Sequence, residues 1–177
     1  MKLGLFALRA VVGGLFIGHG LQKLTGKFGG DGPDGTGQFF ESLGLRPGRQ
    51  HALAAGAAEA GGGALVAAGA YTPIGAALLS GTMLTAIRTV HGRKGPWISD
   101  GGYEYNLVLL AAVFAIADAG PGLLSLDAAK GRRRWGLPWA LMQLAAGAVG
   151  SAAAIEYGRS SSAAAEAAEE EQGLRVA

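Results

Sequence analysis

Five stretches of mostly apolar residues alternate with polar segments along the chain. They cover residues 3–21, 52–70, 73–90, 104–123 and 137–155. A helix needs about 20 mostly apolar residues to cross a hydrocarbon core of about 30 Å, because each residue adds about 1.5 Å. The pattern therefore predicts an all-α, polytopic membrane protein, a compact bundle of four or five transmembrane helices.

The connections between these stretches differ in length and character. Only Tyr71-Thr72 separates the second stretch from the third, so these two should form an antiparallel hairpin, with Pro73 at a helix start, where its missing N–H is not needed. The loop from residue 22 to 51 is long and rich in glycine over residues 26–37. Its second half places Phe39 and Phe40 on one face of a short helix, which we expect to cap the bundle at the membrane interface.

Small residues recur at helical spacing in the first two stretches. Gly14 and Gly18 form one small-xxx-small pair, and Gly56 and Ala60 form another. In lipid there is little hydrophobic force between helices, so small residues favour association by letting two backbones approach closely. The pattern predicts a tight bundle, with these pairs at helix contacts.

The chain divides into three predicted parts. Residues 1–130 contain four of the apolar stretches, residues 131–157 an additional transmembrane helix, and residues 158–177 a flexible tail rich in Ala and Glu. Leu3–Leu21 is long for the apolar region of a signal peptide, so we expect a retained first span. The short basic run from Lys130 to Arg134 favours a multi-pass protein of the cell membrane with a cytoplasmic N-terminus.

Composition supports this class and excludes some chemistry. Only 16% of residues are charged and the mean hydropathy is +0.29, whereas soluble domains carry about 25% charged residues. The pI near 9.1 does not indicate nucleic-acid binding, because the basic run lies beside apolar segments, where membrane topology and anionic lipid explain it. There is no cysteine, so disulfides and iron–sulfur ligation within this chain are excluded.

Ionisable residues from several stretches converge on one predicted layer near a single membrane face. A charge in hydrocarbon costs about 2.5 kcal/mol or more unless it is paired or hydrated, so these residues should share one polar pocket. The candidate catalytic residues are Glu59 and Glu104. The candidate cofactor-binding residues are His19, Lys23, Arg88 and His91.

Alternatives remain open for these residues. Glu59 is either a buried structural partner of Arg88 or Lys23, or a carboxylate that binds a ligand or handles a proton. His19 and His91 could join Glu59 and Glu104 in a metal site, but neither histidine belongs to a compact ligand motif, so no metal is expected.

A second polar pair lies toward the other membrane face. Arg9 and Asp118 have matching predicted depths on the first and fourth stretches, and we expect them to form a structural ion pair.

Several motifs resemble those of a known family. They are Leu8-Arg9, Gly18-His19-Gly20-Leu21-Gln22-Lys23-Leu24, Phe39-Phe40-Glu41-Ser42-Leu43-Gly44-Leu45, Glu59-Ala60-Gly61-Gly62, Gly102-Tyr103-Glu104-Tyr105-Asn106 and Gly120-Pro121-Gly122. Their order and spacing over residues 3–130 resemble the DoxX-like membrane proteins. The resemblance implies a four-helix membrane bundle and polar family positions at Arg9, His19, Gln22, Lys23, Glu59 and Glu104. The segment after residue 131 is not part of the family pattern.

The resemblance also frames three functional hypotheses. Some relatives resemble the membrane subunit of thiosulfate:quinone oxidoreductase and others are associated with oxidative-stress or thiol-redox systems, so the first hypothesis is a redox-associated membrane subunit that binds a quinone headgroup or a small anion. The second is a non-catalytic scaffold for soluble or membrane redox proteins. The third is a small transporter or lipid-handling protein, which would need to form a homo-oligomer. Membrane lipid is an expected partner in all three.

Overall fold

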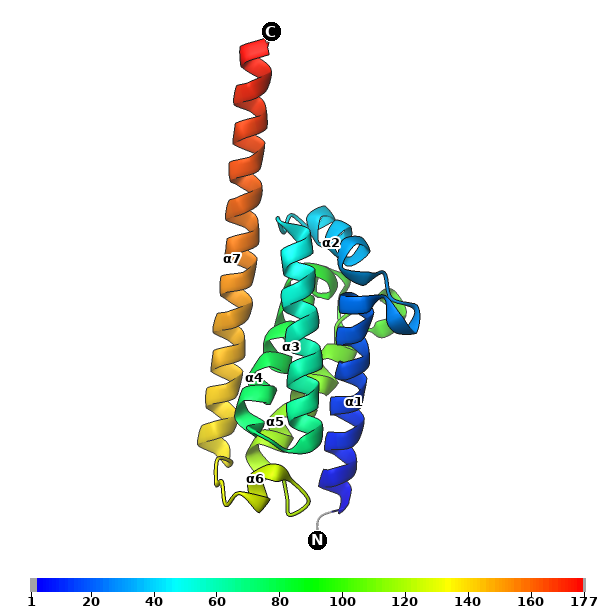
Figure 1. The fold of residues 1–177 in the computed structure, drawn as a ribbon, viewed down its shortest axis with the longest axis vertical. Coiled ribbons are helices and arrows are strands. Elements are labelled where there is room, and N and C mark those ends of the chain that lie inside the picture. Colours follow the sequence, from blue (N-terminus) through cyan, green and yellow to red (C-terminus); the bar gives the residue numbers. More distant parts are fainter. Residues whose placement is uncertain (1–2, 177) are drawn as a thin grey trace.

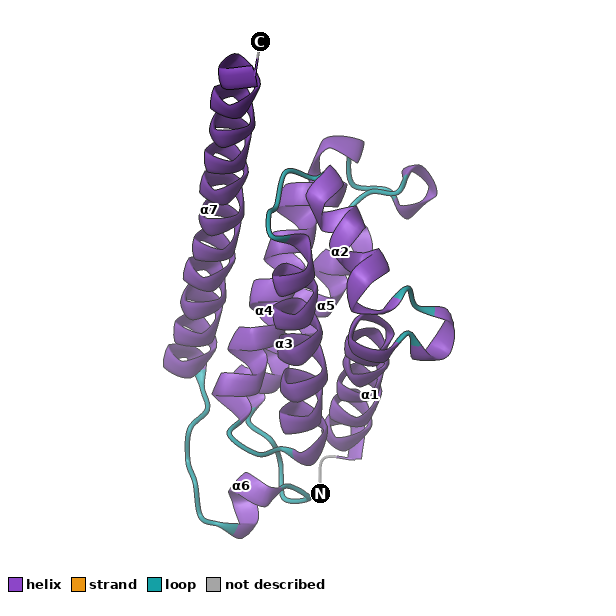
Figure 2. Ribbon diagram, turned by 45° about the horizontal axis from the view of Figure 1, so that its top comes forward, coloured by secondary structure: helices purple, strands orange, loops and turns teal. Residues whose placement is uncertain are grey.

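The computed structural model describes residues 3–176 as an elongated bundle of helices that run up and down between two ends (Figure 1). The long helices are α1 (Leu3–Thr25), α3 (Gly48–Ala68), α4 (Thr72–Ala86), α5 (Glu104–Ala119) and α7 (Leu137–Val176). Two short helices, α2 (Gly32–Ser42) and α6 (Leu126–Ala129), lie in connections at opposite ends of the bundle. Strands are absent from residues 3–176, as Figure 2 shows, which confirms the all-α prediction.

The α3–α4 hairpin forms as the short connection predicts. Gly69 ends α3 with a φ of 60°, and Tyr71 precedes α4 with a φ of 44°. Both lie in the left-handed region, which reverses the chain within a few residues and suits glycine better than tyrosine. Pro73 occupies the first turn of α4, where the backbone N–H has no intrahelical partner. The predicted cap helix is also present, as α2.

The core lies between α1, α3, α4 and α5. Its fully buried members include Phe16, Val66, Leu79, Val113 and Ile116. Helix α1 packs mainly on α3, and α4 contacts α3, α5 and α7. Helix α4 is thus the central element, and α7 reaches the bundle chiefly through it.

Glycine permits the close approach of α1 and α3, although not at all the predicted positions. A Cβ atom on Gly13 would lie 2.5 Å from the Gly63 carbonyl oxygen, and one on Gly20 would lie 2.4 Å from the Ala60 nitrogen. Gly14 has no atom within 4 Å of such a Cβ, and neither does Gly18. The first predicted pair is therefore wrong, because both residues face away from α3.

The second pair, Gly56 and Ala60, does lie at the α1–α3 contact. The backbone oxygen of Gly56 and the backbone nitrogen of Ala60 are both near a Cβ built on Gly20. In α1, the contact uses Gly13 and Gly20, which are separated by two helical turns and so lie on one face.

Three helical segments of the described chain are long and apolar enough to cross a membrane: Leu3–Thr25, Thr72–Lys94 and Leu137–Gln172. The second segment is α4 continued through a π-helical turn, Ile87–His91. Five spans were expected. Helix α5 has only 16 residues, which is about 24 Å at 1.5 Å per residue. Helix α3 begins with the polar run Arg49-Gln50-His51. That these two helices also cross the membrane stays a prediction.

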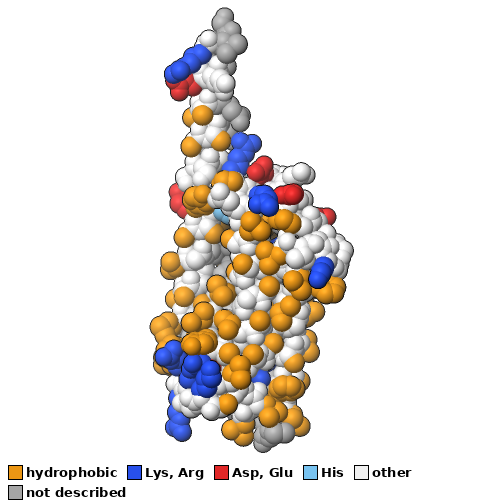
Figure 3. Space-filling view, in the orientation of Figure 1, with side chains coloured by type: hydrophobic (Ala, Val, Ile, Leu, Met, Phe, Trp, Pro, Cys, Tyr) orange, Lys and Arg blue, Asp and Glu red, His pale blue; other side chains and the backbone are white. Residues whose placement is uncertain are grey.

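Charge is distributed as expected for a membrane bundle. The face of the bundle in Figure 3 is largely hydrophobic along its length, and the Lys, Arg, Asp and Glu side chains gather toward the two ends. This distribution places the polar residues where headgroups and water would meet them.

Helix α7 continues without a break from Leu137 to Val176, across the boundary at residue 157 where a flexible tail was predicted. Gly158 and Ser162 still contact the loop between α2 and α3, through Arg46 N to Gly158 O at 3.2 Å and Ser162 Oγ to Gly44 O at 3.1 Å. Beyond these contacts α7 projects past the rest of the bundle, away from the N-terminal end (Figure 1).

Candidate functional site

A large cavity of about 910 Å³ lies among the helices. Its walls come mainly from α3, α4 and α7, with contributions from the ends of α1 and α5 and from Phe39 and Phe40 of α2. Most lining side chains are apolar and many are small, such as Ala54, Ala58 and Gly147. The alanines and glycines of these helices therefore leave space that larger side chains would fill.

One part of this cavity is ionic. Lys23 Nζ lies 2.7 Å from Glu59 Oε2, and the two side chains retain 22% and 7% of their exposure. This settles the partner of Glu59, which sequence reasoning left open between Lys23 and Arg88. Helix α1 delivers the cation and α3 the anion across the glycine contact, so the close packing of these helices makes the short distance possible.

Both histidines of the predicted site also line the cavity. His19 Nδ1 lies 3.1 Å from Gln22 Oε1, and Gln22 Nε2 donates to the Phe28 carbonyl at 3.1 Å. His91 Nδ1 lies 2.7 Å from the Gly101 carbonyl oxygen, which orients its ring at the end of the π-helical turn. A carbonyl oxygen can only accept, so the His91 Nδ1 carries a proton and Nε2 is available to another partner.

The other two predicted site residues lie elsewhere. Arg88 is exposed, and Glu104 begins α5 at the rim of the bundle with its backbone N–H bonded to Pro96 O at 2.7 Å. Neither is among the described residues that line the cavity. Arg88 lies on the same π-helical turn as His91 but is exposed, whereas His91 lines the cavity. Their roles as site residues stay predictions.

Two buried carboxamides of the cavity escaped the set of candidate residues. Gln143 on α7 accepts a hydrogen bond from Ser80 Oγ at 2.8 Å, and Asn106 on α5 donates to Met83 Sδ at 3.4 Å. Each is a polar residue within an apolar stretch, and this position in the sequence could have identified it as a candidate. The selection favoured ionisable residues such as Glu59 and so passed over uncharged side chains.

His51 is a third lining residue that sequence reasoning did not select. It packs against Tyr157 of α7 with ring centroids 5.7 Å apart. This contact joins the start of α3 to the upper part of α7.

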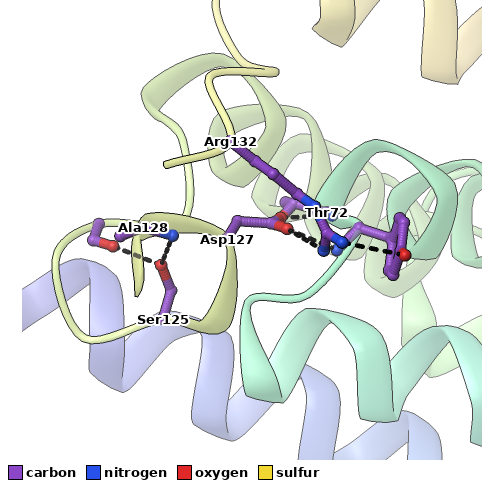
Figure 4. Close-up of polar contacts among 7 residues, drawn as sticks. Thr72, Ser125, Asp127, Ala128 and Arg132 are labelled. Atoms are coloured by element: carbon purple, nitrogen blue, oxygen red, sulfur yellow. Dashed lines mark hydrogen bonds and ion pairs between the residues drawn. The ribbon is translucent and has the colours of Figure 1, made fainter. Parts of the chain in front are cut away.

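A separate polar network holds the opposite end of the bundle together (Figure 4). The Asp127 carboxylate, 4% exposed, accepts hydrogen bonds from Tyr71 N at 2.9 Å, Thr72 N at 3.0 Å and Thr72 Oγ1 at 2.9 Å. Arg132 Nη1 lies 3.4 Å from the same carboxylate, and its guanidinium carbon lies 4.0 Å from the centre of the Tyr71 ring. The free N–H groups at the start of α4 are thereby capped by a residue of α6, in the connection between α5 and α7.

The expected ion pair between Arg9 and Asp118 is not formed among the described residues. Arg9 is 1% exposed, and its guanidinium donates to the carbonyl oxygens of Pro121 and Leu124, while Asp118 is exposed. A matching depth of the two residues in the bundle was not sufficient to form an ion pair, because Asp118 faces outward on α5. Arg9 instead ties α1 to the Gly-Pro-Gly segment that follows α5.

Among the side chains that the structure describes, no group of three or more His, Cys, Asp or Glu residues is arranged to hold a metal ion. The fold and the cavity together define a multi-pass helical membrane protein with a partly open, ligand-sized cavity.

Comparison with known proteins identifies the family. The sequence model of the DoxX family matches residues 4–92. A relative from Bacillus subtilis (strain 168), named "Putative oxidoreductase CatD", is 35% identical over 126 residues, which cover 71% of this chain and 86% of the relative. The chain belongs to the DoxX family. No solved structure matches it.

Proposed function

We propose that this protein is a redox-associated membrane subunit that binds a quinone headgroup, or a small anion, beside Lys23 and Glu59. The observation that carries the proposal is the cavity itself, which combines one ionic region with long apolar walls. Its volume of about 910 Å³ is within the range of about 300–1,000 Å³ that ligand sites usually have. The long apolar walls favour a quinone over a small anion, because a quinone carries an apolar ring and tail.

The chemistry at the ionic end suits a quinone. Reduction of a quinone to a quinol adds two electrons and two protons. Glu59 is positioned to relay a proton, and Lys23 to support negative charge on a quinone oxygen. The electrons would come from a reductant on a partner protein, since the chain has no cysteine for thiol or iron–sulfur chemistry. The name of the Bacillus subtilis relative supports an oxidoreductase setting.

Glu59→Gln should abolish the thermal stabilisation that a menaquinone analogue gives the wild-type protein. The substitution removes the anionic partner of Lys23 and the proton-carrying group while keeping the size of the side chain. The measurement is the shift in Tm with and without analogue, in detergent, for each variant. Glu156→Gln is the matched control, because Glu156 is exposed on α7 and lies outside the cavity lining.

Two results would count against the proposal. One is the absence of any analogue-dependent shift in the wild type. The other is an equal shift in Glu59→Gln and in the wild type.

The projecting end of α7 favours a second candidate function, a scaffold that docks redox proteins. Deleting residues 165–177 preserves the contacts of Gly158 and Ser162 with the α2–α3 loop, so the bundle should keep its Tm. A scaffold would then lose stoichiometric co-purification of its partner, whereas a subunit that binds quinone in the cavity would keep its analogue-dependent shift.

A further inference from the structure

Gln143 has a hydrogen-bond donor with no protein partner. The residue is 2% exposed and lines the cavity. Its Oε1 is bonded to Ser80, but Nε2 is buried without a partner among the described residues. In a membrane interior an amide N–H without an acceptor costs several kcal/mol, because no water is available to replace it.

Asn106 is in a similar position on the neighbouring helix. It is 6% exposed and lines the same cavity. Its Nδ2 donates only to the thioether sulfur of Met83 at 3.4 Å, and such sulfur is a weak acceptor. Two carboxamides from α5 and α7 thus bring poorly satisfied donors to one apolar cavity.

These two residues and Glu59 lie at a similar depth. The α4 partners of Gln143 and Asn106 are Ser80 and Met83, which are one helical turn apart, or about 4.5 Å along the axis. Met83 and Glu59 are equally distant in sequence from Tyr71 in the turn of the α3–α4 hairpin, and paired positions of an antiparallel hairpin share a depth. The cavity therefore has a polar layer supplied by α1, α3, α5 and α7.

We propose that Gln143 and Asn106 form a subsite that donates hydrogen bonds to a carbonyl oxygen, and that the ligand is therefore a neutral carbonyl compound of the quinone class. This inference rests on the proposed function and narrows it, since a small anion would need cations. The Lys23 cation of the cavity is already paired with Glu59. Neutral N–H donors in an apolar setting are matched to a neutral acceptor.

The subsite assigns a binding role to α7, which lies outside residues 4–92 matched by the family model. Helix α7 would complete the cavity as well as extend beyond the bundle. Removing the whole segment after residue 131 would then open one wall of the site.

The test compares Gln143→Leu and Asn106→Leu with wild type, using a short-chain naphthoquinone and, separately, thiosulfate as probes. Leu141→Met is the control, because Leu141 is exposed on α7 two residues before Gln143, lies outside the cavity lining and forms no side-chain hydrogen bond. Each variant should weaken naphthoquinone binding by roughly tenfold, the effect of one neutral hydrogen bond. Without ligand, Gln143→Leu should have a Tm close to that of the wild type, since it removes a buried unpaired donor but also the acceptor of Ser80.

Infrared spectroscopy adds a readout that stability alone would not change. The carbonyl stretch of bound naphthoquinone should lie at lower frequency in the wild type than in Gln143→Leu, because a hydrogen bond weakens the C=O bond. Leu141→Met should keep the wild-type frequency and affinity.

The outcomes separate this inference from the proposed function. If the wild type binds naphthoquinone and both leucine variants bind it equally well, the subsite is refuted and quinone binding stands. A lower ligand-free Tm for Gln143→Leu with unchanged affinity would show a purely structural role. If thiosulfate binds and naphthoquinone does not, the carbonyl assignment is overturned; if neither binds, the proposed function fails as well.

Discussion

Gly13→Leu is expected to separate α1 from α3 and prevent assembly of a stable bundle, whereas Gly14→Leu, at the next residue, should have little effect. A Cβ on Gly13 would lie 2.5 Å from Gly63 O and 2.7 Å from Ala67 N. These are backbone atoms, so they can move only if the helices do. Overpacking of this kind costs about 3 kcal/mol or more. The measurement is apparent Tm and the monodisperse fraction on size-exclusion chromatography in detergent.

Gly14 provides the control because it is exposed and a Cβ there would meet nothing within 4 Å. Both substitutions exchange the same residues in the same helix, so they change helix propensity and hydrophobicity equally. Equal Tm values for the two variants would refute the α1–α3 contact described above. Gly13→Leu should also weaken the Lys23–Glu59 pair, which spans the same interface.

Asp127→Asn is expected to destabilise the protein by about 3 kcal/mol, since the carboxylate accepts several hydrogen bonds in a buried position. An asparagine amide would keep one acceptor oxygen and direct an NH₂ group at N–H donors of Tyr71 and Thr72. It would also leave Arg132 without its anionic partner. Asp118→Asn is the control, because Asp118 is exposed, and its Tm should stay close to that of the wild type.

The same carboxylate predicts a pH dependence. Burial raises the pKa of Asp127, but hydrogen bonds from Thr72, Tyr71 and Arg132 outweigh burial, and the pKa lies below the ordinary value. A carboxyl with a lowered folded-state pKa stabilises the fold at pH values above its unfolded pKa of about 3.9. That stabilisation is lost as the pH falls through the folded-state value.

Thermal unfolding between pH 6 and pH 3 should therefore show a steeper loss of Tm in the wild type than in Asp127→Asn. Parallel curves for the two proteins would contradict the prediction, as would a wild-type Tm that rises on acidification. Asp118→Asn should follow the wild-type curve.

The sequence predicted the helices of the fold better than the direction in which single residues point from them. Length and apolarity were sufficient for the long helices, and the two-residue connection was sufficient for the α3–α4 hairpin. The choice of Gly14 and Gly18 over Gly13 and Gly20 failed because several glycines lie on one helix and only the position of α3 decides which of them face it. The structure continues α7 through the predicted tail, and the flexibility of that segment stays a prediction, since Ala and Glu residues suit both a solvated coil and a helix.

For the candidate site, charge in an apolar stretch was the useful signal. It found His19, Lys23, Glu59 and His91, which line the cavity, because charges inside a bundle must share the few polar spaces available. It could not separate these from Arg88, which faces outward on its turn. The roles of Asp127 and Arg132 depend on a loop meeting the start of α4, a long-range contact that spacing along the chain does not reveal.

The position of the cavity mouth determines the units in which the affinity for a hydrophobic ligand should be expressed. Ile74, Leu78 and Met142 line the cavity and are also exposed on the flank of α4 and α7, among helices apolar enough to lie in the bilayer. A hydrophobic ligand would enter sideways from the lipid, so its occupancy would follow its mole fraction in the membrane. Titrations at two lipid-to-protein ratios should then give different dissociation constants in molar units and the same constant per lipid.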